Sequence, residues 1–328
     1  MRTRAGVLAI ALSLALPVSG CGDPADGDAT SVDWAASAAP VHTDGLIWAN
    51  AAGVIHLADG STLDAQTPIA SYVVAGDGAY VVPEGTRRLV LVTPDGVDET
   101  GAHLDPDTLK ASPDGRYLLC LDPESGERGR YGDPLMQAVV VDLDRGEEVV
   151  RTSEKMGDPG TDDLRDLYED APPGTLGITH DTAYVHAPSD VLTVGLSGGE
   201  VTAEDVDEVF STTQPWYSPR YQDDLNGGPW NPSRTWAIDR AEPRDRFVSG
   251  DGRRVEVIPG TPTWSLSHWI DDHTAVGFAV HAPPDDGFLD QQAETTLMTC
   301  TVPDGACTLV PEAAGPPGSV LLPNSSLL

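Results

Sequence analysis

The chain has 328 residues, and its 19 basic residues against 52 acidic ones give it a formal net charge of −33. Proteins that bind nucleic acid contact its phosphates through clusters of Lys and Arg. This chain has no such cluster, so we exclude nucleic acid as a partner. An anionic lipid surface would also repel so acidic a domain.

The first twenty residues have the three parts of an export signal in the required order. Arg2 and Arg4 give a positive start, and the apolar run over 5–16 is shorter than the roughly twenty residues of a membrane-spanning helix. Small residues then lead to Cys21 in the sequence Val-Ser-Gly-Cys. This segment resembles the lipobox of bacterial lipoproteins, whose cysteine receives lipid on its thiol and is cut from the residue before it.

The resemblance implies a signal peptide over 1–20 and acyl chains, such as palmitate, on Cys21. The alternative is an ordinary signal peptide with a cysteine near its cleavage site. Two or three acyl chains give a stable anchor, which would hold the protein on the extracytoplasmic side of the cell membrane. Residues 21–40 are rich in Ala, Asp, Gly and Ser and predict a flexible acidic tether, which leaves 41–328 as the folded domain.

From residue 45 onward, short β-rich runs alternate with Asp-Gly, Pro-Asp-Gly and Gly-Gly turns, which indicates an all-β domain with at most a turn or two of helix around 161–170. The runs repeat as a tight turn, a strand and an outer strand pair. Six such units, at about 45 residues each, have the spacing of propeller blades. The turn-and-strand segments that open these units begin near residues 46, 76, 111, 180, 231 and 270.

The segment 112–119, Ser-Pro-Asp-Gly-Arg-Tyr-Leu-Leu, resembles the blade entry of bacterial β-propellers of the TolB and WD-repeat-like kind. The resemblance implies the fold and no particular function. We therefore predict a β-propeller of six blades, in which the C-terminal run Val320–Leu322 closes the first blade and removes an open sheet edge. Seven blades, or a pair of two-sheet sandwiches, are the alternatives.

The other cysteines have separate predicted roles. Cys300 and Cys307 flank a Pro-Asp-Gly turn, so a hairpin would place them opposite each other and allow a disulfide outside the cytoplasm. Cys120 lies in an apolar run and predicts a buried free thiol.

Two segments interrupt the repeat, and such insertions on a rigid scaffold often carry function. Residues 158–173 are acidic, and Asp162, Asp163 and Asp166 could hold Ca²⁺, although a solvated acidic loop explains them as well. Residues 214–230 carry aromatic side chains that suit contact with a protein, peptide or glycan, or that could pack between blades. These aromatic residues are Trp216, Tyr217, Tyr221 and Trp230.

No nucleophile elbow, phosphate-binding loop or metalloprotease motif is present in the sequence. The sequence therefore favours a monomeric, non-enzymatic lipoprotein that binds a protein, peptide or cell-envelope partner. The alternatives are a small-molecule sensor or hydrolase-type enzyme that uses the axial cavity of the propeller, and a purely structural envelope protein.

Overall fold

Within its described residues the chain forms 23 short β-strands separated by turns. Strands such as Gly78–Pro83 and Tyr117–Asp122 are buried at every position, because successive side chains point to opposite faces of a sheet and both faces are covered here. The structure, a computed structural model, describes residues 32, 34–205, 230–240, 243–285, 290 and 292–323. Within these residues the strands form six sheets, five of four strands and one of three, in which neighbouring strands are antiparallel. The predicted all-β class is confirmed.

The first three sheets use the first eleven strands and the last one. Sheet 1 contains β23 (Val320–Leu321), β1 (Trp48–Asn50), β2 (Val54–His56) and β3 (Thr62–Asp64). Sheet 2 contains β4 (Ile69–Ala75), β5 (Gly78–Pro83), β6 (Arg88–Thr93) and β7 (Gly96–His103). Sheet 3 follows the short helix η1 (Pro106–Thr108) and contains β8 (Lys110–Ala111), β9 (Tyr117–Asp122), β10 (Gln137–Asp142) and β11 (Glu147–Thr152).

The other three sheets follow in chain order. Sheet 4 comes after the helix α1 (Leu164–Asp170) and contains β12 (Gly174–Ile178), β13 (Thr182–His186), β14 (Asp190–Gly195) and β15 (Val201–Asp205). Sheet 5 contains β16 (Trp236–Asp239), β17 (Arg246–Ser249) and β18 (Arg254–Glu256). Sheet 6 contains β19 (Thr263–Trp269), β20 (Thr274–Val280), β21 (Thr295–Thr301) and β22 (Cys307–Gly315).

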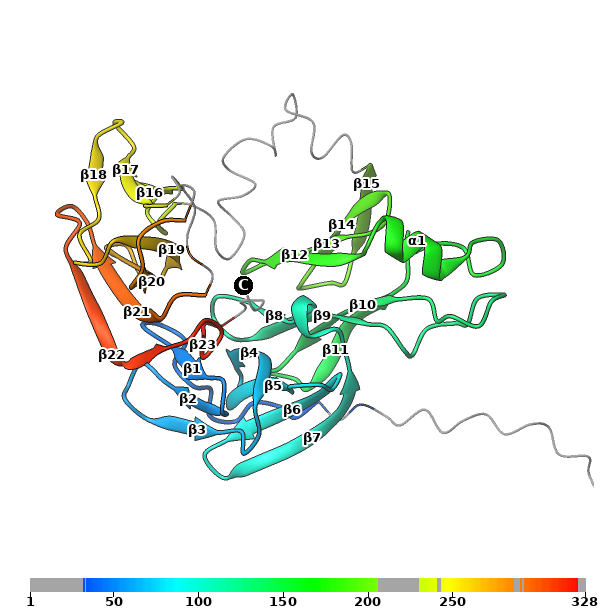
Figure 1. Cartoon of the computed structure of the whole chain (residues 1–328). Coiled ribbons are helices and arrows are strands. Elements are labelled where there is room, and N and C mark those ends of the chain that lie inside the picture. The colour runs from blue at the N-terminus through cyan, green and yellow to red at the C-terminus, as the bar shows by residue number, and fades with distance from the viewer. Residues whose placement is uncertain are drawn as a thin grey trace, which may run out of the picture. The chain divides into compact units, whose positions relative to one another are not determined.

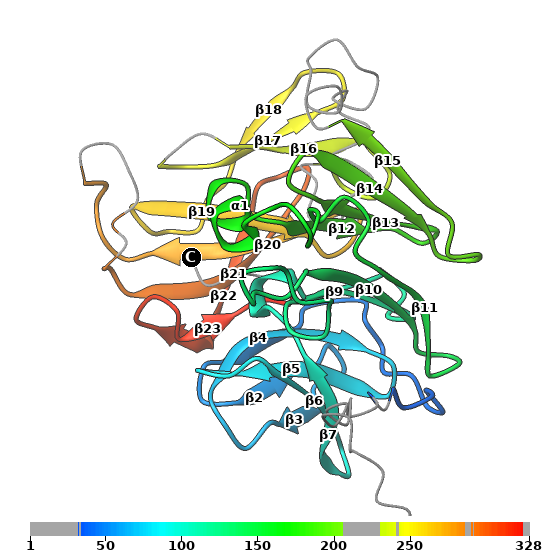
Figure 2. The ribbon, with the colours of Figure 1, turned by 90° about the vertical axis from the view of Figure 1, so that its right-hand side faces the viewer.

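Each sheet is one blade of a β-propeller, and the blades follow one another in chain order (Figure 1). In the described part of the chain, apolar clusters join blades 1 and 2, 2 and 3, 3 and 4, 5 and 6, and 6 and 1. Figure 2 shows the sheets of blades 2, 3 and 4 one above another. The prediction of six blades is confirmed: between β9 and β13, the described chain adds only α1 and two long connections to the strands of blades 3 and 4, and it forms no further sheet there.

The C-terminal strand closes the first blade, as the sequence predicts. Ala49 pairs with Leu321 and Asn50 with Val320, so β23 lies beside β1 although the two are at opposite ends of the domain (Figure 1). The buried hydroxyl of Tyr72 in blade 2 donates to the carbonyl of Leu321 at 3.2 Å. This pairing holds β23 in place and covers a sheet edge that would otherwise be open.

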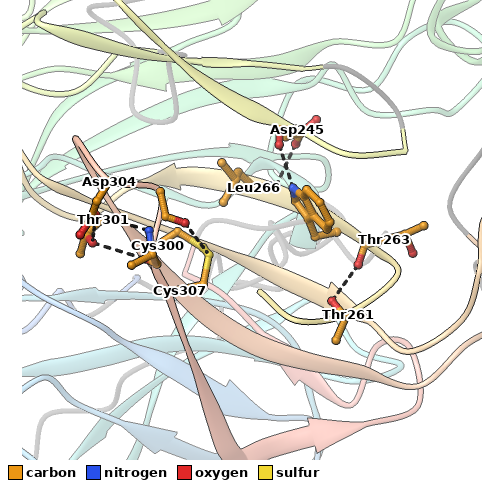
Figure 3. The surroundings of a disulfide bond; sticks show 11 residues. Asp245, Thr261, Thr263, Leu266, Cys300, Thr301, Asp304 and Cys307 are labelled. Atoms are coloured by element: carbon orange, nitrogen blue, oxygen red, sulfur yellow. Dashed lines mark hydrogen bonds between the residues drawn. A yellow bond between two sulfur atoms is a disulfide. The ribbon is translucent and has the colours of Figure 1, made fainter. Parts of the chain in front are cut away.

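The predicted disulfide joins neighbouring strands of blade 6. Cys300 on β21 and Cys307 on β22 are paired across the sheet, with their Cα atoms 4.1 Å apart (Figure 3). The Thr301 hydroxyl lies 3.0 Å from the Asp304 carboxylate in the turn between them. Cys120 is a free and buried cysteine, which confirms that prediction too.

The two ends of the blades differ in their connections. Because strands alternate in direction, the turns from first to second and from third to fourth strand share one end, which we call the turn end. The remaining connections share the loop end. In blades 2 to 4 the turn-end connections are short: 76–77, 94–95, 112–116, 143–146, 179–181 and 196–200. The long described connections, 123–136 and 153–173, both lie at the loop end.

The folded unit begins earlier than the sequence predicts. Val32 and the described residues from Trp34 onward belong to the same compact unit as the propeller, whereas the tether was expected to run to residue 40. The Trp34 side chain is buried among residues of blades 2 and 3, and this contact holds the following residues against the domain. The acidic composition of residues 21–40 predicts a tether throughout, but Trp34 within this segment packs into the hydrophobic core.

Candidate functional site

The aromatic insertion that the sequence singles out falls mostly outside the described residues, as do Trp216, Tyr217 and Tyr221. Cys21 also lies outside them. Trp230 is described: it is half-buried and makes an isolated antiparallel bridge with Ala237 of β16. Trp230 thus lies beside the first described strand of blade 5, where the other blades have their innermost strand.

The acidic insertion folds into α1 and its flanking loop. Asp163 is the N-cap of α1, and its carboxylate accepts from the backbone N–H of Asp166. The Asp162 carboxylate accepts from the N–H of Asp158 at 2.7 Å. These carboxylates therefore order their own loop, and the described ranges contain no group of three or more acidic, His or Cys side chains that could hold a metal ion.

The two long loop-end connections, 123–136 and 153–173, pack against each other, and Figure 1 shows them side by side with α1. We call this unit the platform. The Tyr168 hydroxyl on α1 holds both connections together, because it accepts from the N–H of Met136 at 3.0 Å and donates to the carbonyl of Met156 at 2.9 Å. The sequence predicts the helix of the platform, but it does not predict that Tyr168 joins the two connections.

An apolar layer fixes the platform to the blades. Leu135, Met156 and Leu164 are buried in the cluster that joins blades 3 and 4. On the outer side, the Arg165 guanidinium pairs with the Asp133 carboxylate at 3.0 Å. The platform is therefore continuous with the core, and its surface is held in one conformation by buried contacts.

The tip of the platform exposes a stacked Arg–Tyr pair. Tyr131 is 55% exposed, and it is one of two large hydrophobic residues in the described ranges that the fold leaves exposed. The Arg130 guanidinium lies 4.5 Å from the ring centroid of Tyr131 and also hydrogen-bonds to its hydroxyl. The backbone of the tip is fixed by Arg128, which donates to the carbonyl of Gly132 at 2.9 Å.

An exposed Tyr beside Arg is typical of the residues that contribute most to protein interfaces. A ring already fixed by stacking loses little conformational entropy when a partner covers it. Sequence reasoning missed this pair. The available signal was an aromatic residue between Gly129 and Gly132 in a connection much longer than the other turns of blade 3.

An enzymatic site was the alternative, and the innermost strand of blade 6, β19, places a hydroxyl beside an imidazole. The Ser267 hydroxyl and Nδ1 of His268 lie 3.0 Å apart. Burial and the nearby Arg240 guanidinium lower the pKa of His268 to about 4. An imidazole with so low a pKa is a weak general base near neutral pH, so this pair does not favour a hydrolase.

Comparisons with known proteins find likeness in fold only. No family model matches the sequence, and no curated protein sequence matches it significantly. Similar solved structures include a protein assigned as TolB from Agrobacterium tumefaciens, at 11% identity and a TM-score of 0.38, over 75% of this chain and 81% of that one. AztD from Citrobacter koseri has 12% identity and a TM-score of 0.31, over 84% and 85% of the two chains. Both scores are low, so the assignment of the fold depends on the strand pairing above.

Proposed function

We propose that the chain is a lipoprotein, anchored through Cys21 outside the cytoplasm, whose propeller presents the platform to a protein or peptide partner. The exposed Tyr131–Arg130 pair on a rigid platform carries this proposal. The lipobox-like sequence supports the anchor. No helix in the described ranges is both long and apolar enough to cross a membrane.

Charge supports a basic partner in preference to an acidic one. The net charge of the chain is −33, and the platform connection 153–173 is rich in Asp and Glu. Complementary charge increases the rate of association and selects against acidic competitors, and salt weakens both effects. We therefore expect binding to weaken as ionic strength rises.

The platform is tested by replacing Tyr131 and, as a matched control, Ile258, the other exposed hydrophobic residue, which is 65% exposed. Full-length protein is used to capture partners from solubilised cell envelopes, and affinities are then measured with the purified partner. Tyr131→Ala should weaken binding about tenfold or more, as for an interface hot spot. Ile258→Ala should leave binding unchanged.

Two further measurements complete the test. Both variants should change the free energy of unfolding by less than about 0.5 kcal/mol, because both side chains are exposed. Equal affinity of wild type and Tyr131→Ala for every captured partner would refute the platform as the binding site. Mass spectrometry of the mature N-terminus tests the lipid: a Cys21 without acyl groups would refute the anchor.

A further inference from the structure

Residues 34–41, which we call the strap, lie against the turn end of blades 2 and 3. The Trp34 side chain is 7% exposed and belongs to the apolar cluster between these blades. Its ring centroid is 6.5 Å from that of Tyr80, and its Nε1 donates to the Glu148 carboxylate at 3.1 Å. Trp34 is thus an integral part of the core, although it precedes the first strand.

Backbone hydrogen bonds hold the rest of the strap. The N–H of Ser37 donates to the carbonyl of Leu143 at 2.7 Å, and the N–H of Val41 donates to the carbonyl of Gly76 at 2.8 Å. Leu143 lies in the turn-end connection 143–146 of blade 3, and Gly76 lies in the turn-end connection 76–77 of blade 2. The strap therefore crosses from one blade to the next.

Asp77, in the first turn of blade 2, binds the middle of the strap. Its carboxylate accepts from the N–H of Ala38 at 2.8 Å, from the N–H of Ala39 at 2.7 Å and from the Ser37 hydroxyl. Partial burial acts to raise the pKa of Asp77, but these three hydrogen bonds keep it below its usual value. The charged carboxylate is thus the form that holds the strap.

The turn of blade 3 is shaped for the strap. Gly146 has a φ of 65°, and a Cβ there would lie 2.4 Å from the carbonyl oxygen of Trp34. Only glycine permits so close a backbone approach in this conformation. Four separate features, at Trp34, Leu143, Asp77 and Gly146, therefore place the strap at the same position.

The docked strap shortens the tether and fixes the point where it leaves the domain. Only residues 22–33 separate Cys21 from Trp34. If these residues are the flexible tether that their composition predicts, a chain of that length has a root-mean-square span of about 20 Å. The innermost strand β4, with seven residues, alone covers about 23 Å between the two ends of its blade. The tether is therefore too short, on average, to bring the loop end to the membrane.

We infer that the turn end is the membrane-facing surface of the anchored protein and that the platform points away from the bilayer. This inference rests on the proposed lipid at Cys21. Aspartates occupy the turns of this end, including Asp59, Asp77, Asp114, Asp251 and Asp304. Their charge opposes adsorption to anionic lipid, so the turn end faces the membrane without binding it.

Energy transfer from a fluorophore on the lipidated full chain to an acceptor dye in lipid vesicles tests the orientation. One donor is attached to Asp95→Cys at the turn end and another to Glu169→Cys on α1; both positions are exposed, and Cys120 is buried. We expect a greater loss of donor emission at position 95. A longer tether, with about twenty Gly and Ser residues inserted after Thr30, should abolish that difference and leave the folded domain unchanged.

Matched variants separate the strap from general effects. Trp34→Ala combined with Asp77→Ala removes both the buried ring and the carboxylate that hold the strap, so it lengthens the free tether and should reduce the difference between the two donors. Asp304→Ala removes a turn carboxylate whose hydrogen bonds go to Thr301 and Ala306, and it should keep the difference. If the vesicle-bound protein with the native tether lost equal emission at positions 95 and 169, or more at position 169, the proposed orientation would be overturned but the anchor would not. A wild type that stays in solution, as Cys21→Ser should, would overturn the anchor as well.

Discussion

Replacing Trp34 by Ala tests whether the strap is a part of the fold that can detach by itself. The Trp34 ring is buried between blades 2 and 3, and its indole N–H is bonded to Glu148. Glu148 also accepts two hydrogen bonds from the Arg151 guanidinium, so the substitution does not leave a carboxylate without a partner. The cost is therefore mainly the loss of apolar burial.

The size of this cost follows from the area buried. A Trp side chain buries roughly 150–250 Å², and about 25 cal/mol per Å² gives a gross contribution of about 4–6 kcal/mol. Truncation of buried aromatic residues to Ala costs about 3–5 kcal/mol in folded cores. If the strap leaves its site while the propeller stays folded, its residues regain about 1–2 kcal/mol each in backbone entropy, which lowers the cost. We therefore expect a loss of about 3 kcal/mol and an undocked strap.

Hydrogen exchange measures undocking directly. The amides of Ser37, Ala38, Ala39 and Val41 are all bonded to the propeller and should exchange slowly in the wild type. In Trp34→Ala they should exchange like free peptide, while amides of the blade strands stay protected. Trp34→Phe keeps a buried ring and loses one hydrogen bond, so it should cost only about 1 kcal/mol. Unchanged exchange of the strap in Trp34→Ala would refute the reasoning.

Three further predictions concern cysteines and a histidine. The double variant Cys300→Ser with Cys307→Ser should lower the free energy of unfolding by about 2–3 kcal/mol, as the short closed loop implies, when measured by urea titration. Burial raises the pKa of the Cys120 thiol to about 12, so a thiol reagent at pH 8 should modify Cys120 only after unfolding. The pKa of His268 is lower in the fold, at about 4, than in the unfolded chain, so its contribution to stability should be constant well above pH 6.5 and fall by about 3 kcal/mol between pH 6.5 and 4. In His268→Gln this decrease should be absent.

The sequence predicts the repeat because the chemistry of each turn is local. A tight turn such as Pro113–Gly115 needs a glycine with positive φ and a side chain that caps the turn, and both needs are visible within five residues. The disulfide follows from the same logic, since two cysteines around a tight turn specify their own pairing. The closing strand depends on a distant partner, and it could be predicted because the first blade and the C-terminal apolar run each need a neighbouring strand.

The strap and the platform could not be predicted in this way, because each depends on contacts between distant segments. Trp34 lies among Ala, Asp and Ser, and its site is formed by residues more than forty positions later, including Tyr80 and Glu148. The Tyr168 hydroxyl joins two connections that are separate in the sequence. From composition alone, the strap is expected to be part of a tether and the platform a solvated loop. Their contacts with distant residues give both a defined structure.

The difference between the two ends follows from how blades join. Turn-end connections join adjacent antiparallel strands within one sheet, so a few residues suffice. At least one such turn also packs closely on the next blade: Gly199 of blade 4 leaves only 2.8 Å between a Cβ and the carbonyl oxygen of Val149 in blade 3. Lengthening these turns would disrupt the ring, whereas loop-end connections such as 123–136 can lengthen outward. A binding surface can therefore extend outward at the loop end, and the lipid anchor proposed at Cys21, attached through the strap at the turn end, would leave that surface free.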